Sequence, residues 1–216
     1  MLFRSYGDLW DIGVSDDDEI VVLNRESNRL LHYDMNGNFK KKFVTPPRQN
    51  VKFTSISVDV HGRFVITSGP RYEETREDTE PCILVYNQSG KLSMVFGDEI
   101  LLSPQKAVFL NGNFFVADSG IESLVVFDKS GNVVKEIAKG CLEHPCSVAA
   151  DYTHGNLVVC DRGNPAIYIY SQTGEFLHCL QMENIPLQVA FTKNFENLII
   201  CFEVDYGKNI QMLTYS

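Results

Sequence analysis

Long apolar runs and the common catalytic signatures are both missing from this sequence of 216 residues. No apolar run approaches the roughly 18 residues that a membrane-spanning helix needs, so no membrane partner is expected. There is no G-x-S-x-G, H-E-x-x-H, phosphate-binding loop or dinucleotide fingerprint. Sustained helical periodicity is also missing, which argues against folds that place helices between strands. These absences disfavour an enzyme and leave an all-β architecture.

Basic residues are outnumbered in this chain. There are 19 Lys and Arg against 28 Asp and Glu, which gives a formal net charge of −9. An acidic chain repels phosphate backbones unless its basic residues gather on one face. Protein is therefore the expected partner, and RNA is a disfavoured alternative.

Histidine and cysteine are too few and too scattered to predict a metal centre. Cys141, His144 and Cys146 lie close together in the sequence, but a fourth ligand for zinc is not in evidence. Residues 1–10 lack the apolar stretch of a signal peptide, which favours free thiols in a reducing compartment over disulfides. We expect a cytoplasmic protein with no metal and no cofactor.

An internal repeat organises the whole chain. Its first segment recurs five times without gaps, and its last three copies begin at Pro104, Pro145 and Pro186, at intervals of 41 residues. A second segment follows each first one: EIVVLN (19–24), RFVITS (63–68), NFFVAD (113–118), NLVVCD (156–161) and NLIICF (197–202). A third follows in turn: RLLHYD (29–34), CILVYN (82–87), SLVVFD (123–128), AIYIYS (166–171) and NIQMLT (209–214).

A fourth, more polar segment completes most copies of the repeat. The fourth segments are NFKKKF (38–43), KLSMVF (91–96), NVVKEI (132–137) and EFLHCL (175–180). All these segments are short, rich in Val, Ile, Phe and Tyr, and bounded by turn residues, which predicts strands. A glycine precedes each fourth segment, as a tight hairpin requires. Four antiparallel strands per unit of about 40 residues are typical of a propeller blade.

The repeat resembles the NHL repeat. The best copies are NFFVADS (113–119) followed by SLVVFDKSG (123–131), and PCSVAADYTHGNLVVCD (145–161). The chain departs from the family in the first segment, where the usual glycine is replaced, and in the second, where the Asp survives only as Asp118 and Asp161. The resemblance implies an NHL-repeat β-propeller like the C-terminal propeller of tripartite-motif ubiquitin ligases.

The whole chain, residues 1–216, is predicted to be one propeller. Its blades are expected at about 9–43, 53–97, 104–138, 145–181 and 186–216. Residues 1–8 (MLFRSYGD) align with KLSMVFGD (91–98) and are predicted to form an outer strand. Either this strand completes the last blade of a five-bladed ring, or the chain is part of a six-bladed ring. The second reading is favoured.

The function expected from the resemblance is recognition without catalysis. The propeller would bind a protein partner, as the substrate-recognition module of a ubiquitin ligase whose RING lies outside this chain. One alternative is an NHL propeller that binds single-stranded RNA in post-transcriptional regulation. A second and weaker alternative is a propeller lyase or hydrolase, for which convergent metal ligands at the axis are missing.

The site is predicted on the face where second strands connect to third strands and where consecutive blades connect. Arginine, lysine and aromatic residues there are the usual anchors of interfaces. The candidates are Arg25, Arg48, Lys52, Arg71, Lys106, His144, Arg162, Phe202 and Tyr206. An acidic insert at 69–81 is either a solvated loop or an arm for a basic partner. Asp118 and Asp161 are expected to cap their own turns rather than to act in catalysis.

Overall fold

The computed structural model describes residues 9–15, 19–24, 27–44, 50–70, 79–192, 194–204 and 207–215. It divides into two compact units, Met1–Ala107 and Val108–Ser216, each of which is described by itself. The described residues form strands and turns with no helix, so none of them could span a membrane as a helix. The all-β prediction is confirmed.

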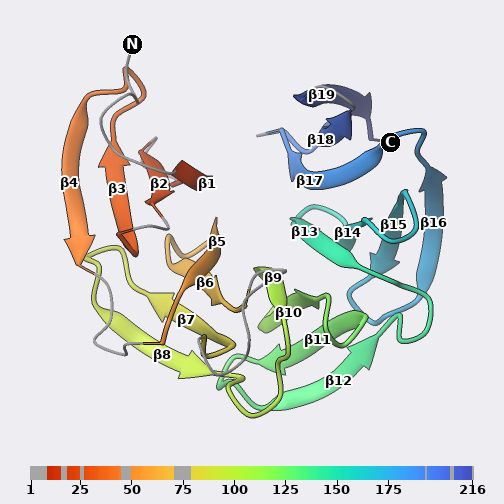
Figure 1. Cartoon of the computed structure of the whole chain (residues 1–216), viewed down its shortest axis with the longest axis horizontal. Helices are drawn as coiled ribbons and strands as arrows, with labels where there is room; N and C mark the ends of the chain where they lie inside the picture. Colours follow the sequence, from red (N-terminus) through yellow and green to blue (C-terminus); the bar gives the residue numbers. More distant parts are fainter. Residues whose placement is uncertain are drawn as a thin grey trace. The chain divides into compact units, whose positions relative to one another are not determined.

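The strands form five antiparallel sheets in sequence order (Figure 1). The first contains β1 (Leu9–Val14), β2 (Ile20–Asn24), β3 (Arg29–Tyr33) and β4 (Phe39–Val44). The second contains β5 (Phe53–Val58), β6 (Phe64–Ser68), β7 (Cys82–Tyr86) and β8 (Leu92–Phe96). The third contains β9 (Pro104–Leu110), β10 (Asn113–Asp118), β11 (Ser123–Asp128) and β12 (Val133–Ile137).

The last two sheets belong to the second unit. The fourth sheet contains β13 (Pro145–Asp151), β14 (Asn156–Asp161), β15 (Ala166–Ser171) and β16 (Phe176–Gln181). The fifth contains β17 (Ile185–Phe191), β18 (Asn197–Val204) and β19 (Gly207–Thr214), and has three strands where the other sheets have four. Within each sheet every strand pairs with the next in the chain, which is the meander of a propeller blade.

The turns between third and fourth strands follow one local design. In the third sheet the Asp128 carboxylate accepts the backbone N–H groups of Ser130, at 2.8 Å, and Asn132, at 2.9 Å. Gly131 adopts a φ of 85°, which costs a glycine little and other residues much. Hydrogen bonds from Asn132 hold the pKa of Asp128 below its usual value. The charged carboxylate therefore favours the turn.

The core lies between neighbouring sheets within each unit. In the first unit Leu23, Phe53, Ile66 and Leu84 belong to one buried cluster. In the second unit one cluster joins the third and fourth sheets, and another joins the fourth and fifth. The outer strands are wetter, which agrees with their more polar sequences: most of β12 and β16 is exposed or half-buried.

The fifth sheet has an apolar face that nothing covers among the described residues. Ile210 and Met212 of β19 are 69% and 64% exposed. Ile167 and Ile169 occupy the same repeat positions on β15 and are 0% and 8% exposed. The fifth sheet buries Ile167 and Ile169 through Val189, Leu198 and Ile200. The same repeat positions are therefore buried on β15, where the fifth sheet packs against them, and exposed on β19 among the described residues.

This contrast predicts unequal costs for the same truncation. Ile167→Ala should lower the free energy of unfolding by about 3 kcal/mol, because it leaves a cavity in a packed cluster. Ile210→Ala should cost about 0.5 kcal/mol or less, because its side chain lies in solvent. Urea denaturation followed by circular dichroism measures both values. Equal losses would mean that another part of the protein covers Ile210.

His32 is a buried titratable group in the first unit. Its side chain is 1% exposed, and its Nδ1 lies 3.1 Å from Oε2 of Glu19, which also binds Lys40 through Oε1 at 2.9 Å. Burial lowers the pKa of His32, and the neighbouring cations Lys41 and Lys40 add to this effect against the opposing influence of Glu19. Protonation therefore favours the unfolded chain.

This lowered pKa predicts a loss of stability on mild acidification. The unfolded chain takes up a proton near pH 6.5 before folded His32 does, so stability falls as the pH drops below about 6.5. His32→Val installs the aliphatic residue that the repeat has at Val85 and should flatten this dependence. Urea denaturation at pH 7.5 and 5.5 compares the two proteins. An unchanged slope in the variant would assign the dependence to other groups.

Candidate partner-binding site

The structure describes five of the nine predicted binding residues: Lys52, Lys106, His144, Arg162 and Phe202. The other four lie outside the described residues: Arg25, Arg48, Arg71 and Tyr206. Residues 71–78 of the acidic insert at 69–81 also lie outside the described residues. At the end of the insert, the backbone N–H of Glu80 donates to the Asn50 carbonyl at 2.7 Å. Their roles stay predictions.

Asp161 organises one end of the fourth sheet. Its buried carboxylate accepts the backbone N–H groups of Glu143, at 2.9 Å, His144, at 2.7 Å, and Gly163, at 3.1 Å. These bonds join the segment before β13 to the turn after β14. Gly163 packs closely there, since a Cβ at this position would lie 2.5 Å from Cβ of Glu143. Asp161 thus rigidifies the loop that carries His144 and Arg162.

The predicted capping roles of both aspartates are confirmed. Asp118 ends β10 as Asp161 ends β14, and its Oδ1 accepts the N–H groups of Gly120, at 2.9 Å, and Ile121, at 3.2 Å. Both carboxylates are fully buried. Charge-assisted bonds to several backbone donors explain how buried carboxylates are tolerated at these positions. These capping bonds explain the environment of both side chains without a catalytic role.

Arg162 is presented on the surface beside this rigid loop. Its Nη2 lies 2.8 Å from Oε2 of Glu203 on β18, and the two side chains are 37% and 46% exposed. An exposed ion pair of this kind contributes little to stability, because water screens both charges. The backbone N–H of Arg162 also donates to the His144 carbonyl at 3.0 Å. We call Glu143, His144, Arg162 and Glu203 the Arg162 patch.

Phe202 is placed in the core and not on a binding surface. It is 4% exposed and belongs to the cluster that joins the fourth and fifth sheets. Phe202 was predicted as an anchor because it ends a second segment and aromatic residues on that face are usual interface anchors. An apolar ring gains more from packing against this cluster than from facing water.

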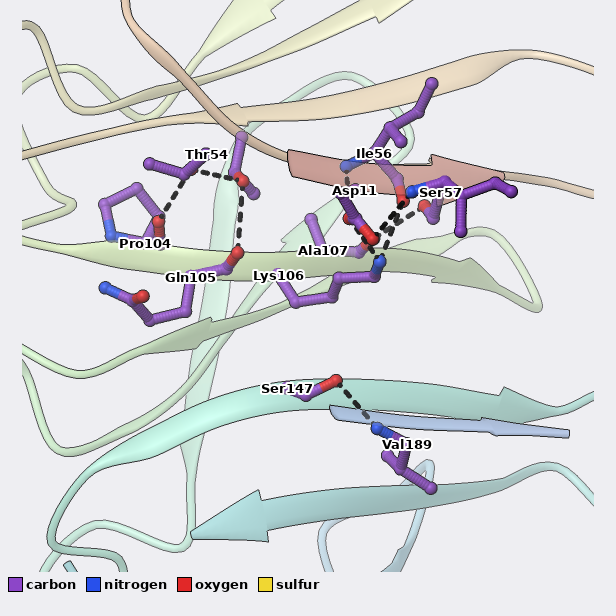
Figure 2. Close-up of polar contacts among 12 residues, drawn as sticks. Asp11, Thr54, Ile56, Ser57, Pro104, Gln105, Lys106, Ala107, Ser147 and Val189 are labelled. Carbon is purple, nitrogen blue, oxygen red and sulfur yellow. Dashed lines mark hydrogen bonds and ion pairs between the residues drawn. The ribbon is translucent and has the colours of Figure 1, made fainter. Parts of the chain in front are cut away.

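Lys106 also differs from its predicted role as a surface cation. It lies on β9, and its Nζ binds Oδ2 of Asp11 at 2.7 Å and the Ile56 carbonyl at 2.8 Å (Figure 2). The same Asp11 oxygen accepts the N–H of Ile56 at 2.9 Å. The side chains of Asp11 and Lys106 are 3% and 14% exposed. The ammonium is therefore committed to an internal link between first strands.

Other polar contacts join the first strands of neighbouring sheets. In the first unit Ser57 Oγ donates to the Ala107 carbonyl at 2.7 Å (Figure 2). In the second unit the N–H of Val189 donates to Ser147 Oγ at 3.3 Å (Figure 2). Gly13 permits the close approach of β1 and β5, since a Cβ there would lie 2.9 Å from Cγ2 of Val58. Small residues in these strands thus serve strand packing.

The geometry gives no support to a zinc site at Cys141, His144 and Cys146. Cys146 Sγ donates to the carbonyls of Pro186, at 3.3 Å, and Leu187, at 3.4 Å. Burial raises the pKa of the Cys146 thiol to about 12, and the thiol is engaged by backbone carbonyls rather than turned toward Cys141 or His144 in a shared site. Among the described residues no three His, Cys, Asp or Glu side chains group as metal ligands would.

The Asp11–Lys106 link predicts strong coupling between two distant residues. Asp11→Asn or Lys106→Met alone should each cost about 3 kcal/mol, because each leaves a largely buried charge without its partner. The double variant should cost clearly less than the two single costs combined. Urea denaturation of the four proteins gives the coupling energy. Additive losses would show that the two charges do not interact.

Comparisons with known proteins agree with this architecture. No family model matches the chain. The Drosophila melanogaster protein brain tumor is 26% identical over 134 residues, which is 62% of this chain and 12% of that protein. The chain thus spans a small part of this relative's length.

Solved structures match over most of the chain. One is a chain of the nidogen/laminin complex, with a TM-score of 0.75 and 16% identity, covering 91% of this chain and 73% of that one. Another is streptogramin B lyase, with a TM-score of 0.69 and 14% identity, covering 99% of this chain and 70% of that one. At these identities the matches establish the fold alone. The chain is an all-β propeller distantly related to brain tumor, which confirms its resemblance to the NHL propellers of tripartite-motif proteins.

Proposed function

We propose that this propeller is a non-catalytic scaffold that binds a protein partner through the Arg162 patch. The observation that carries the proposal is the Asp161 carboxylate, which fixes the loop bearing His144 and Arg162 through three backbone N–H groups. A rigid loop loses little conformational entropy when a partner docks. The patch combines an arginine with carboxylates, which suits a partner surface that carries both charges.

The relatives support binding as the general activity. One of the similar solved structures is a complex of nidogen with laminin. The distant relationship to brain tumor further suggests a recognition module of the tripartite-motif kind. We propose on this basis that the propeller selects substrates for a ubiquitin ligase in the cytoplasm, with the RING module outside this chain.

RNA binding and enzymatic activity have weaker support. The described cations Lys106 and Arg162 are bound to the carboxylates of Asp11 and Glu203, which lowers the positive potential that a phosphate backbone needs. Streptogramin B lyase shares the fold at 14% identity, and a shared fold does not carry an activity with it.

Charge reversal tests the proposal. Arg162→Glu should reduce the capture of crosslinked protein partners by about tenfold, because it removes the central cation of the patch. Lys129→Glu is the matched control, since Lys129 is an exposed lysine in the β11–β12 turn at the other end of the same unit. The measurement is quantitative mass spectrometry of partners captured by each tagged protein after nuclease treatment.

Two outcomes would count against a protein partner at this patch. One is equal capture by Arg162→Glu and the unmodified protein. The other is capture that disappears with nuclease, which would mean that nucleic acid bridges the captured proteins.

A further inference from the structure

The connection between the second and third sheets, residues 97–103, exposes two aliphatic side chains. Ile100 is 42% exposed and Leu102 is 36% exposed, and they flank Leu101, which is fully buried. The carbonyl of Gly97 accepts the backbone N–H groups of Ile100, at 3.1 Å, and Leu101, at 2.8 Å. Two backbone bonds and a buried leucine therefore hold this turn in place, which lowers the entropy that a partner's docking would cost.

The equivalent connection in the second unit, residues 138–144, has the same design 41 residues later. The carbonyl of Ala138 accepts the N–H groups of Cys141, at 3.0 Å, and Leu142, at 3.3 Å. Leu142 is 2% exposed and corresponds to Leu101. The two turns therefore share their backbone bonds and their buried leucine, and each can serve as the reference for the other.

The two turns differ at their exposed positions. Ile100 and Leu102 correspond to Cys141 and Glu143, and all four residues are exposed. A glutamate at one of these positions shows that the turn itself does not require an aliphatic side chain there. An exposed aliphatic side chain gains free energy when another apolar surface removes it from water. The aliphatic pair is therefore better explained by an interface than by the architecture of the turn.

Two carboxylates accompany the aliphatic pair. Asp98 and Glu99 are exposed in the same turn, whereas the corresponding residues in the second unit are Lys139 and Gly140. An apolar centre with a polar rim is the usual anatomy of a protein interface. Charges on the rim select a partner of the opposite sign. A partner that fits this turn therefore brings apolar side chains next to lysine or arginine.

We infer that residues 98–102 form a second docking surface, which binds a segment of a partner protein with apolar side chains flanked by lysine or arginine. Ile100 and Leu102 would contact the apolar side chains, and Asp98 and Glu99 the basic ones. The surface belongs to the first unit and is carried by observations other than those on the Arg162 patch. Either surface can therefore bind when the other does not.

The charge of this surface argues for a partner over the protein's own chain. The acidic insert at 69–81 begins beside the turn, since a Cβ at Gly69 would lie 2.9 Å from Cδ of Pro104. The insert carries five carboxylates against two arginines, and a segment of that charge is repelled by Asp98 and Glu99. A second copy of the chain is disfavoured for the same reason, because each copy has a net charge of −9.

The test uses two fluorescent synthetic peptides with blocked ends, KKLFKK and EELFEE, and the full 216-residue chain at physiological salt. Fluorescence anisotropy should show saturable binding of KKLFKK and about tenfold weaker binding of EELFEE, because its charges oppose Asp98 and Glu99. The double variant Ile100→Ser, Leu102→Ser should weaken the binding of KKLFKK by about tenfold, because it removes the apolar contact and keeps both carboxylates.

Two further variants serve as controls. Val60 is an aliphatic residue in the β5–β6 turn of the same unit and is 51% exposed. Val60→Ser should leave the binding of KKLFKK within about twofold, because this turn is not part of the surface. Arg162→Glu should also leave it within about twofold, which separates this surface from the Arg162 patch. Circular dichroism checks that every variant folds.

Several results would overturn the inference. These are no saturable binding of KKLFKK, equal binding of the two peptides, or equal binding by the double variant and the unmodified chain. The same loss in Val60→Ser as in the double variant would place the binding elsewhere, and a loss in Arg162→Glu alone would assign it to the Arg162 patch. Binding that appears only after deletion of residues 71–78 would make the insert the occupant. A dimer in sedimentation that the double variant dissociates would make a second copy the occupant.

Discussion

Each sheet of this repeat has two apolar faces, and the rest of the structure depends on covering both of them. β14 shows the covered state, in which every residue from Leu157 to Asp161 is buried. β18 has nearly the same sequence, yet its residues alternate between buried and exposed along much of the strand. The difference lies in the neighbours, because the fifth sheet is covered on one face only by described residues. Stability in such an array comes from interfaces between repeats as much as from the repeats themselves.

The polar residues of the first strands and strand ends serve the same requirement. First strands approach closely, so they carry small side chains and use hydrogen bonds such as Ser57 to Ala107 and Ser147 to Val189. The Asp11–Lys106 pair belongs to this group. At the end of β14, Asp161 joins two loops by accepting hydrogen bonds from their backbone N–H groups. Most buried charge in the described chain thus serves architecture, which leaves recognition to exposed loops.

Much of the fold could be predicted from the sequence, because strand length, alternation and glycine turns are local signals. The second and third segments match observed strands closely, as NLVVCD matches β14. Contacts between sheets could not be predicted in this way. Asp11 and Lys106 hold the same position in their repeats, but the repeat does not show which side chains of the first strands pair with each other. The surface placement of Phe202 was wrong, because an aromatic residue at a strand end can serve as an interface anchor or as core, and only the packing shows that it is buried.

The proposed partner of this propeller is a protein and not a nucleic acid. Fluorescence anisotropy with a random pool of single-stranded RNA, at low and at physiological salt, tests this most directly. No binding is expected at physiological salt, because the chain carries a net charge of −9 and Lys106 and Arg162 are bound to the carboxylates of Asp11 and Glu203. Binding in the micromolar range or tighter at physiological salt would contradict it.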